Sequence, residues 1–144
     1  MFDAQKKIPP SMSRSGWLSC HDFGDALSKE FTMASHEIAK IDAEAACLTL
    51  INVYEVEPEK QADLVRRLSE ATDTVIRRQP GFVSVSIHSS MDGKRVVNYA
   101  QWASKEDFES FMKKPETQEQ LKQFAALAKT ISPVLCKVNG VHAE

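Results

Sequence analysis

The order of strand-like and helix-like stretches in the C-terminal two thirds of this chain constrains its fold most strongly. Residues 47–56 are rich in β-branched and aromatic side chains, which is typical of a strand. An apolar stripe at helical spacing follows and ends at Pro80-Gly81. Residues 82–90 and 94–102 are again strand-like, and the Asp92-Gly93 pair between them is typical of a two-residue hairpin turn.

The remaining residues repeat the order of helix and then strand. Ser104 and Asp107 have the spacing of a capping box and predict a helix start, and Pro115 splits the helical region that follows. Ser132-Pro133 ends it, and residues 134–141 form the fourth strand-like stretch. The order β-α-β-β-α-β predicts an α+β fold of ferredoxin-like type, a four-stranded antiparallel sheet with helices on one face. The uncovered face predicts a homodimer, because a second copy can bury it.

We expect two parts in the chain, an N-terminal extension over residues 1–45 and one domain over residues 46–142. Apolar residues recur at spacings of three and four from Leu27 to Ala45, which predicts a helix in the extension. This helix could pack on a partner subunit, cover a pocket, or be a marginal surface helix behind a disordered tail. A further alternative is that Met33 is the natural start.

Composition excludes several classes of function. The chain has 18 basic and 20 acidic residues and a formal charge of −2, so it lacks the basic excess of a nucleic-acid-binding protein. Its longest mostly apolar stretch, residues 46–54, is far shorter than the roughly 20 residues of a membrane helix. The three cysteines form no CxxC pair, and no secretory signal precedes the domain. We therefore expect a soluble cytoplasmic protein without a metal site.

The hairpin predicts which residues share a sheet face. A two-residue loop at Asp92-Gly93 would make the numbers of opposed residues sum to 185. The opposed pairs would then be Ile87 with Asn98, Val85 with Ala100 and Val83 with Trp102. Asn98 and Trp102 would lie on the apolar face under the helices, whereas Phe82 and His88 would lie on the other face. A buried Asn needs hydrogen-bond partners or a ligand. In the alternative interpretation, Asn98 bonds to nearby backbone and Trp102 is simply core.

Two segments resemble the antibiotic biosynthesis monooxygenase family. They are TLINVYEVEPEKQADL (49–64) and QPGFVSVSIHSSMDGKRVVNYAQWASKEDFESF (79–111), and the resemblance extends over about residues 46–142. It implies a ferredoxin-like subunit that dimerises into an α+β barrel. It also implies an oxidoreductase, a cofactor-free monooxygenase that acts with O2 on a small aromatic substrate such as a phenol, an anthrone or a polyketide.

The resemblance implies catalytic roles for three residues. Asn98 and Trp102 match an Asn and a Trp four residues apart on the third strand of these oxygenases, and Asn52 matches an Asn on the first strand. Tyr54 alternates with Asn52 on the same strand, so it could reach the substrate pocket or equally be a core residue. Further residues expected in the pocket are Val83, Val85, Phe111 and Leu121. An Asn amide can donate to a developing oxyanion, and a Trp can donate its N–H while its ring packs on the substrate.

Other branches of the family fit less well. Relatives that degrade haem ligate the iron through a His on the second helical region, where this chain has Leu121 at the approximate position. We therefore expect no haem, and because a deprotonated phenol can itself reduce O2, no other cofactor. No general base is evident, since the predicted register places His88 on the wrong face. The alternatives are an isomerase or an enzyme that processes signal molecules, and a dimeric ligand-binding or stress-related protein without activity.

Overall fold

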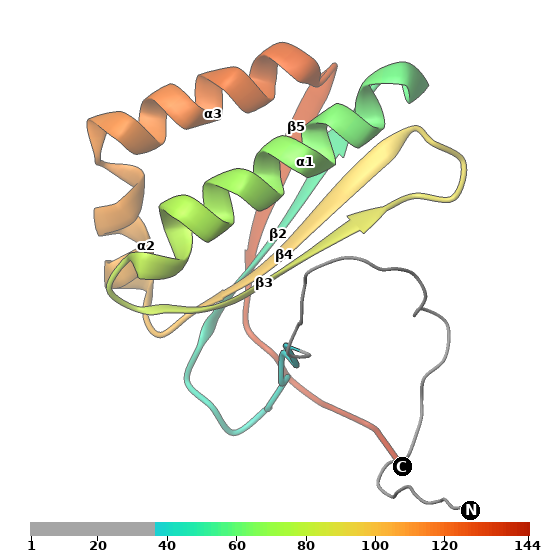
Figure 1. Ribbon diagram of the computed structural model, residues 1–144. Coiled ribbons are helices and arrows are strands. Elements are labelled where there is room, and N and C mark those ends of the chain that lie inside the picture. Colours follow the sequence, from blue (N-terminus) through green and yellow to red (C-terminus); the bar gives the residue numbers. More distant parts are fainter. Residues whose placement is uncertain (1–36) are drawn as a thin grey trace, which may run out of the picture. The chain divides into compact units, whose positions relative to one another are not determined.

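The computed structural model describes residues 37–144, of which residues 39–144 form one unit. In chain order its elements are β2 (Leu48–Glu55), α1 (Pro58–Thr74), the 3₁₀ turn η1 (Ile76–Arg78), β3 (Phe82–Ser89), β4 (Arg95–Trp102), α2 (Lys105–Met112), α3 (Pro115–Leu127) and β5 (Thr130–Cys136). The sheet has the order β3-β4-β2-β5 with antiparallel neighbours, and the three helices lie on one face of it (Figure 1). The structure confirms the predicted α+β, ferredoxin-like fold with a split second helix.

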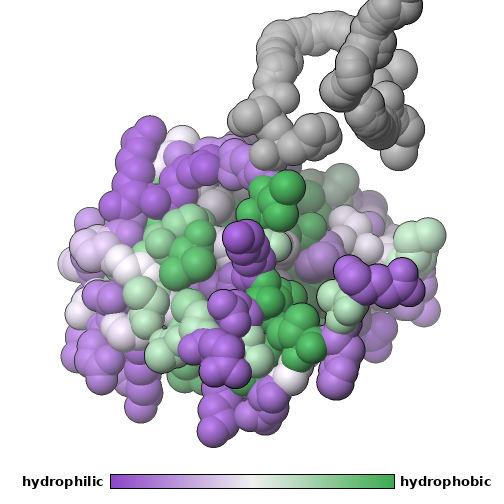
Figure 2. Space-filling view, turned by 90° about the horizontal axis from the view of Figure 1, so that it is seen from below, coloured by the Kyte–Doolittle hydropathy of each residue, from purple (hydrophilic) through white to green (hydrophobic). Residues whose placement is uncertain are grey.

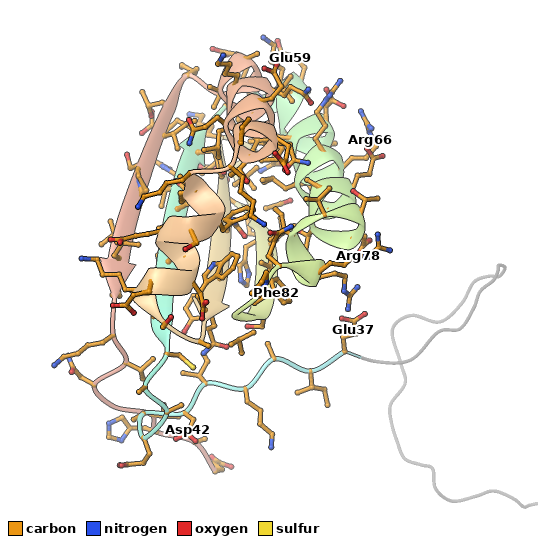
Figure 3. The ribbon with its side chains drawn as sticks, turned by 90° about the vertical axis from the view of Figure 1, so that its left-hand side faces the viewer. Glu37, Asp42, Glu59, Arg66, Arg78 and Phe82 are labelled. Carbon is orange, nitrogen blue, oxygen red and sulfur yellow. The ribbon has the colours of Figure 1, made fainter. Side chains whose placement is uncertain are left out.

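The local signals that predicted the helices have their expected physical roles. Pro58 opens α1, where its missing N–H costs nothing, and Leu64 and Leu68 are buried along the side of α1 that packs on the core. Ser104 Oγ accepts from the backbone N–H of Asp107 at 3.0 Å and caps α2. Figure 3 shows Arg66 and Arg78 pointing away from the sheet on the outer side of the helical layer. The helices therefore present an apolar side to the sheet and a charged side to solvent.

The β3–β4 hairpin has the predicted register over most of its length. Ile87 pairs with Asn98, and Val85 pairs with Ala100. The loop is nevertheless wider than the two residues expected. β3 ends at Ser89 and β4 begins at Arg95, so residues 91–94 make the turn beyond the hydrogen bond between Ser90 N–H and Arg95 O (3.0 Å). A wider loop of this kind leaves the sum of opposed residue numbers unchanged.

The expected pairing of Val83 with Trp102 is wrong. The register shifts between Phe82 and Ser84, so that Phe82 lies opposite Trp102 and Val83 is 46% exposed. An irregularity of this kind inserts one unpaired residue and turns the preceding side chain to the other face. Phe82 consequently packs edge-on against Trp102, with ring centroids 6.0 Å apart, instead of facing away from the helices.

The last strand also differs from the expectation. β5 begins at Thr130 instead of residue 134, ends at Cys136, and contains Pro133, which we expected to lie before it. A proline is tolerated there because β5 is an edge strand, where a missing N–H interrupts no ladder on the outer side.

The predicted N-terminal helix is absent where the structure can test it. Residues 37–47 contain a turn and no helix, and Asp42 accepts from the N–H groups of Glu44 and Ala45. Such local bonding by an Asp competes with helix formation. Residues 27–36 of that prediction lie outside the described part of the chain.

The sheet face opposite the helices has an apolar centre. It carries Ile51 and Val53 of β2, Val97 and Tyr99 of β4, and Val134 of β5, and no helix of residues 39–144 covers it. Figure 2 shows that apolar residues also reach the surface among hydrophilic ones at the end of the molecule seen from below. No helix within residues 37–144 is long and apolar enough to cross a membrane.

Gly81 and Gly93 allow a matched test of how β3 joins the helical layer. Both have a positive φ, +84° and +79°, but only at Gly81 would a Cβ collide with the side chain of Asp107. At Gly93 the same Cβ would meet only Pro58, at an ordinary 3.6 Å. We expect Gly81→Ala to lower the free energy of unfolding by about 2–4 kcal/mol and Gly93→Ala by about 1–2 kcal/mol, measured by urea denaturation. An equal decrease in the free energy of unfolding for both variants would show that the contact with Asp107 does not affect stability.

Candidate active site

A cavity of about 370 Å³ lies between the helices and the sheet. Its walls come from all four strands and from α1, α2 and α3. It separates two groups of buried side chains, one around Tyr54, Leu64 and Phe124 and the other around Trp102 and Phe108. This volume falls in the range of small-molecule sites, about 300–1,000 Å³.

Two amides lie side by side in the sheet wall of this cavity. Asn52 of β2 and Asn98 of β4 are directly opposed on the two central strands, and both line the cavity. Asn52 Nδ2 donates to the Tyr54 hydroxyl oxygen at 3.1 Å. Both Oδ1 atoms are buried, and neither has a hydrogen-bond partner among the described residues. Leaving such an amide oxygen unpaired lowers the stability of the fold by about 1–3 kcal/mol. A core that binds no ligand has no reason to retain such atoms.

Tyr54 adds a third polar group to the same wall. Its side chain is 2% exposed, and its burial raises the pKa of the phenol to about 12. The hydroxyl is therefore neutral at physiological pH. Because its oxygen accepts from Asn52, the hydroxyl proton is available for another acceptor in the cavity. Tyr54 is suited to donate a hydrogen bond and unsuited to remove a proton.

Trp102 forms an aromatic wall at the other end of the strand pair. It is 2% exposed and stacks on Phe111, with ring centroids 4.9 Å apart and planes 26° from parallel. Phe108 meets it edge-on at 5.9 Å. Flat apolar faces held in this way favour a planar aromatic ligand.

The cavity brings together most of the residues that the sequence predicts for a site. Asn52, Asn98 and Trp102 line it, as do four of the five expected substrate-binding residues, Tyr54, Val85, Phe111 and Leu121. Val83 does not line it, because the irregularity in β3 places this residue outside. His88 is exposed and pairs with Val97, whose side chain belongs to the opposite sheet face, so it lies away from Asn98 as predicted.

Several lining residues have no motif that could have revealed them. Thr72 of α1, Met112 of α2, and Thr117 and Phe124 of α3 reach the cavity through helix packing. Among them, Phe124 shares helical spacing with the apolar residues Leu121, Ala125 and Ala128, which is typical of a buried position. Leu121, expected where haem-degrading relatives have a His, lines the cavity and carries no ligand atom.

The cavity has mostly apolar walls, and its hydrogen-bond donors are mainly uncharged. Among the lining residues of the described part of the chain there is no Asp, Glu or His, and Lys122 is the one charged side chain. Within residues 37–144, no three His, Cys, Asp or Glu side chains cluster in a way that could hold a metal ion. The arrangement can bind a flat ring and stabilise negative charge on its oxygen, but no lining carboxylate or imidazole is placed to take a proton.

Comparison with known proteins agrees with this geometry. Tetracenomycin-F1 monooxygenase from Streptomyces glaucescens is 40% identical over 101 residues, which span 70% of this chain and 89% of that protein. Among solved structures, the monooxygenase of the gene ActVA-Orf6 of Streptomyces coelicolor, in complex with nanaomycin D, is 28% identical with a TM-score of 0.63 and covers 67% of this chain and 91% of its own. An anthrone oxidase-like protein is 29% identical with a TM-score of 0.64, over 69% of this chain and 42% of its own.

The family model for antibiotic biosynthesis monooxygenase matches residues 47–123, which is more than half of the chain and contains every element described above except the end of α3 and β5. The match includes β2, β4 and most of α3, the elements that carry Asn52, Asn98 and Leu121. This chain therefore belongs to the antibiotic biosynthesis monooxygenase family and is a monooxygenase.

Proposed function

We propose that this monooxygenase oxidises an electron-rich aromatic substrate, a phenol or anthrone of polyketide type, with O2 and without a cofactor. The observation that carries the proposal is the pair of amides, Asn52 and Asn98, with the neutral Tyr54 hydroxyl beside them in an apolar cavity. These groups suit a substrate that becomes an oxyanion and is otherwise flat and apolar.

Relatives support the same class of substrate. One solved relative was captured with nanaomycin D, and another is described as anthrone oxidase-like. The curated relative at 40% identity acts on tetracenomycin F1. We carry over only what these share, an oxygenated aromatic ring system.

In the proposed reaction the substrate supplies the electrons. An anthrone loses a proton from its CH2 carbon to give an enolate, which transfers an electron to O2. Recombination forms a carbon–oxygen bond, and cleavage of the O–O bond with loss of the second CH2 hydrogen leaves a carbonyl and releases water. One oxygen atom thus enters the product and the other leaves as water, so atoms and electrons balance without another reductant.

The residues divide this work by position. The side chain of Asn98 makes no hydrogen bond within residues 37–144, so its Nδ2 can donate to the enolate oxygen. Asn52 holds the Tyr54 hydroxyl and thereby orients a second donor. Trp102 and Phe111 form the stacked wall on which the ring lies. With no lining carboxylate or imidazole, the site lowers the pKa of the substrate by stabilising its anion, and the proton leaves to solvent.

The size of the cavity favours this proposal over a ligand-binding protein without activity. A closed, dry space around Asn98 with no volume for a ring would have favoured that alternative. The observed 370 Å³ lies instead within the range of small-molecule sites. An isomerase would need a group that moves a proton between two carbons, and the described lining residues offer no carboxylate or imidazole for it.

Asn98→Ala is the direct test of the oxyanion donor. We expect kcat for oxygen consumption with 1,8-dihydroxyanthrone to fall by about 10²–10³-fold, the loss typical when one such donor is removed. The fold should survive, because the amide contributes no hydrogen bond to it. His88→Ala, on the exposed opposite face, is the control and should retain activity. Full activity in Asn98→Ala would remove Asn98 from the mechanism.

Trp102 variants test the aromatic wall separately. Trp102→Phe retains a ring to stack on Phe111, whereas Trp102→Ala removes it. We therefore expect KM for the same anthrone to rise more in Trp102→Ala than in Trp102→Phe. The loss of the indole N–H alone should be the smaller effect. A Phe variant as impaired as the Ala variant would assign the main role to the N–H instead of the ring.

The raised pKa of Tyr54 predicts an alkaline loss of stability. Below pH 10 the phenol is neutral in both folded and unfolded chains. Between pH 10 and about 12 the phenol ionises only in the unfolded chain. The free energy of unfolding therefore falls by about 2–3 kcal/mol across that interval. Urea denaturation from pH 9 to 12 should show a smaller decline for Tyr54→Phe than for the unmodified protein. Parallel declines would mean that Tyr54 ionises normally in the folded chain.

We also propose that the protein is a homodimer joined through the bare sheet face. Its apolar centre, including Val97 and the exposed Val134, is a surface that a second copy could bury. Val134→Glu should lower the molar mass measured by light scattering at about 10 µM, because it places a charge in this interface. Met91→Glu, in the exposed hairpin loop, should leave the mass unchanged. Monomers in the unmodified protein would refute the proposal.

A further inference from the structure

Thr117 is a buried polar residue that the proposed mechanism leaves unused. It lies in the first turn of α3, is 2% exposed and lines the cavity. Its Oγ1 has no hydrogen-bond partner among the described residues. A buried hydroxyl without a partner is destabilising, so its presence calls for a reason.

Other threonines on the helices show what the usual partner would be. Thr72 Oγ1 donates to Leu68 O at 2.8 Å, and Thr74 Oγ1 donates to Glu70 O at 2.7 Å. Each uses the carbonyl one turn earlier, as helical threonines commonly do. Thr117 has no such helical carbonyl behind it, because α3 begins only two residues earlier at Pro115. Its hydroxyl therefore remains available to a ligand.

The helix start around Thr117 is itself short of acceptors. The N-cap residue Lys114 has no side-chain acceptor that could cap the turn, and its Nζ donates to Gln79 Oε1 at 2.7 Å. The first-turn N–H groups of a helix carry partial positive charge and favour an oxygen with negative charge. The unpaired hydroxyl and the uncapped turn thus favour the same kind of ligand atom.

Thr117 and Asn98 lie on opposite walls of the cavity. Asn98 belongs to the central strand β4, and Thr117 belongs to the helical layer that covers this face of the sheet (Figure 1). The hydroxyl hydrogen of Thr117 can rotate about the Cβ–Oγ1 bond, so this group can either donate a hydrogen bond to a ligand oxygen or accept one from a ligand hydroxyl.

We infer that Thr117 and the first turn of α3 form a second oxygen-binding subsite, which selects aromatic substrates with oxygen substituents at both edges of the ring system. One oxygen is the reacting enolate or phenolate held at Asn98, and the other is a hydroxyl or carbonyl held at Thr117. This inference rests on the proposed function, because it assumes that an oxygenated aromatic occupies the cavity.

The test compares two probes that differ only in hydroxyls on the edge opposite the C9 oxygen, anthrone and 4,5-dihydroxyanthrone, bound under nitrogen so that no turnover occurs. We expect the unmodified protein to prefer the dihydroxy probe in equilibrium dialysis. Thr117→Val should weaken binding of that probe by about 3- to 10-fold and leave anthrone unchanged, since one hydrogen bond is lost. Thr117→Ser should retain the preference.

Thr49→Val is the matched control. Thr49 is also 2% exposed with an unpartnered Oγ1, but it does not line the cavity. Both Val variants should unfold at the same or a higher urea concentration than the unmodified protein, because neither loses a hydrogen bond.

Each other outcome overturns a specific claim. A preference retained in Thr117→Val, or lost equally in Thr49→Val, would overturn the subsite and leave the proposed function intact. A marked loss of stability in Thr117→Val would mean that the hydroxyl has a structural partner, which also overturns the subsite. If neither probe binds to the unmodified protein, the proposed function fails, and the subsite fails with it.

Discussion

The paired amides of Asn52 and Asn98 are the constraint on which the rest of the site depends. They lie opposite each other on the two central strands, under the helices, where an ordinary sheet would carry apolar residues. Their unpartnered oxygens lower the stability of the fold by about 1–3 kcal/mol for each group. The cavity lies at this pair, between the two groups of core side chains.

The walls around the amides determine which ligand can satisfy them. Trp102, stacked on Phe111, offers a flat apolar surface. Tyr54 is kept neutral by burial and provides a proton donor. A ligand that meets all of these groups is planar and largely apolar. It carries an oxygen that can take negative charge and accept from the donors, and a hydroxyl that can donate to the unpartnered amide oxygens. The protein thus contributes binding and electrostatic stabilisation, and we propose that the substrate contributes the electrons.

Much of the fold and part of the site could be predicted because the relevant signals are local. Turn residues and helix caps act within a few positions, so the order of elements followed from them, as with Ser104 at the start of α2. The register that pairs Ile87 with Asn98 followed from the hairpin, since strand alternation carries it along the chain. Resemblance to a family added Asn52, which no local pattern singles out.

Local patterns along the chain were therefore enough to predict the ferredoxin-like order and the face shared by Asn98 and Trp102. Tertiary structure alone decided where this pattern breaks. It placed Phe82 inside and Val83 outside, because the register of β3 shifts by one residue there and the Phe82 ring packs on Trp102. It also brought Thr117 to the cavity, because the position of α3 depends on its packing against neighbouring elements. A sequence reports periodicity along one element, whereas the contents of a cavity depend on how several elements meet.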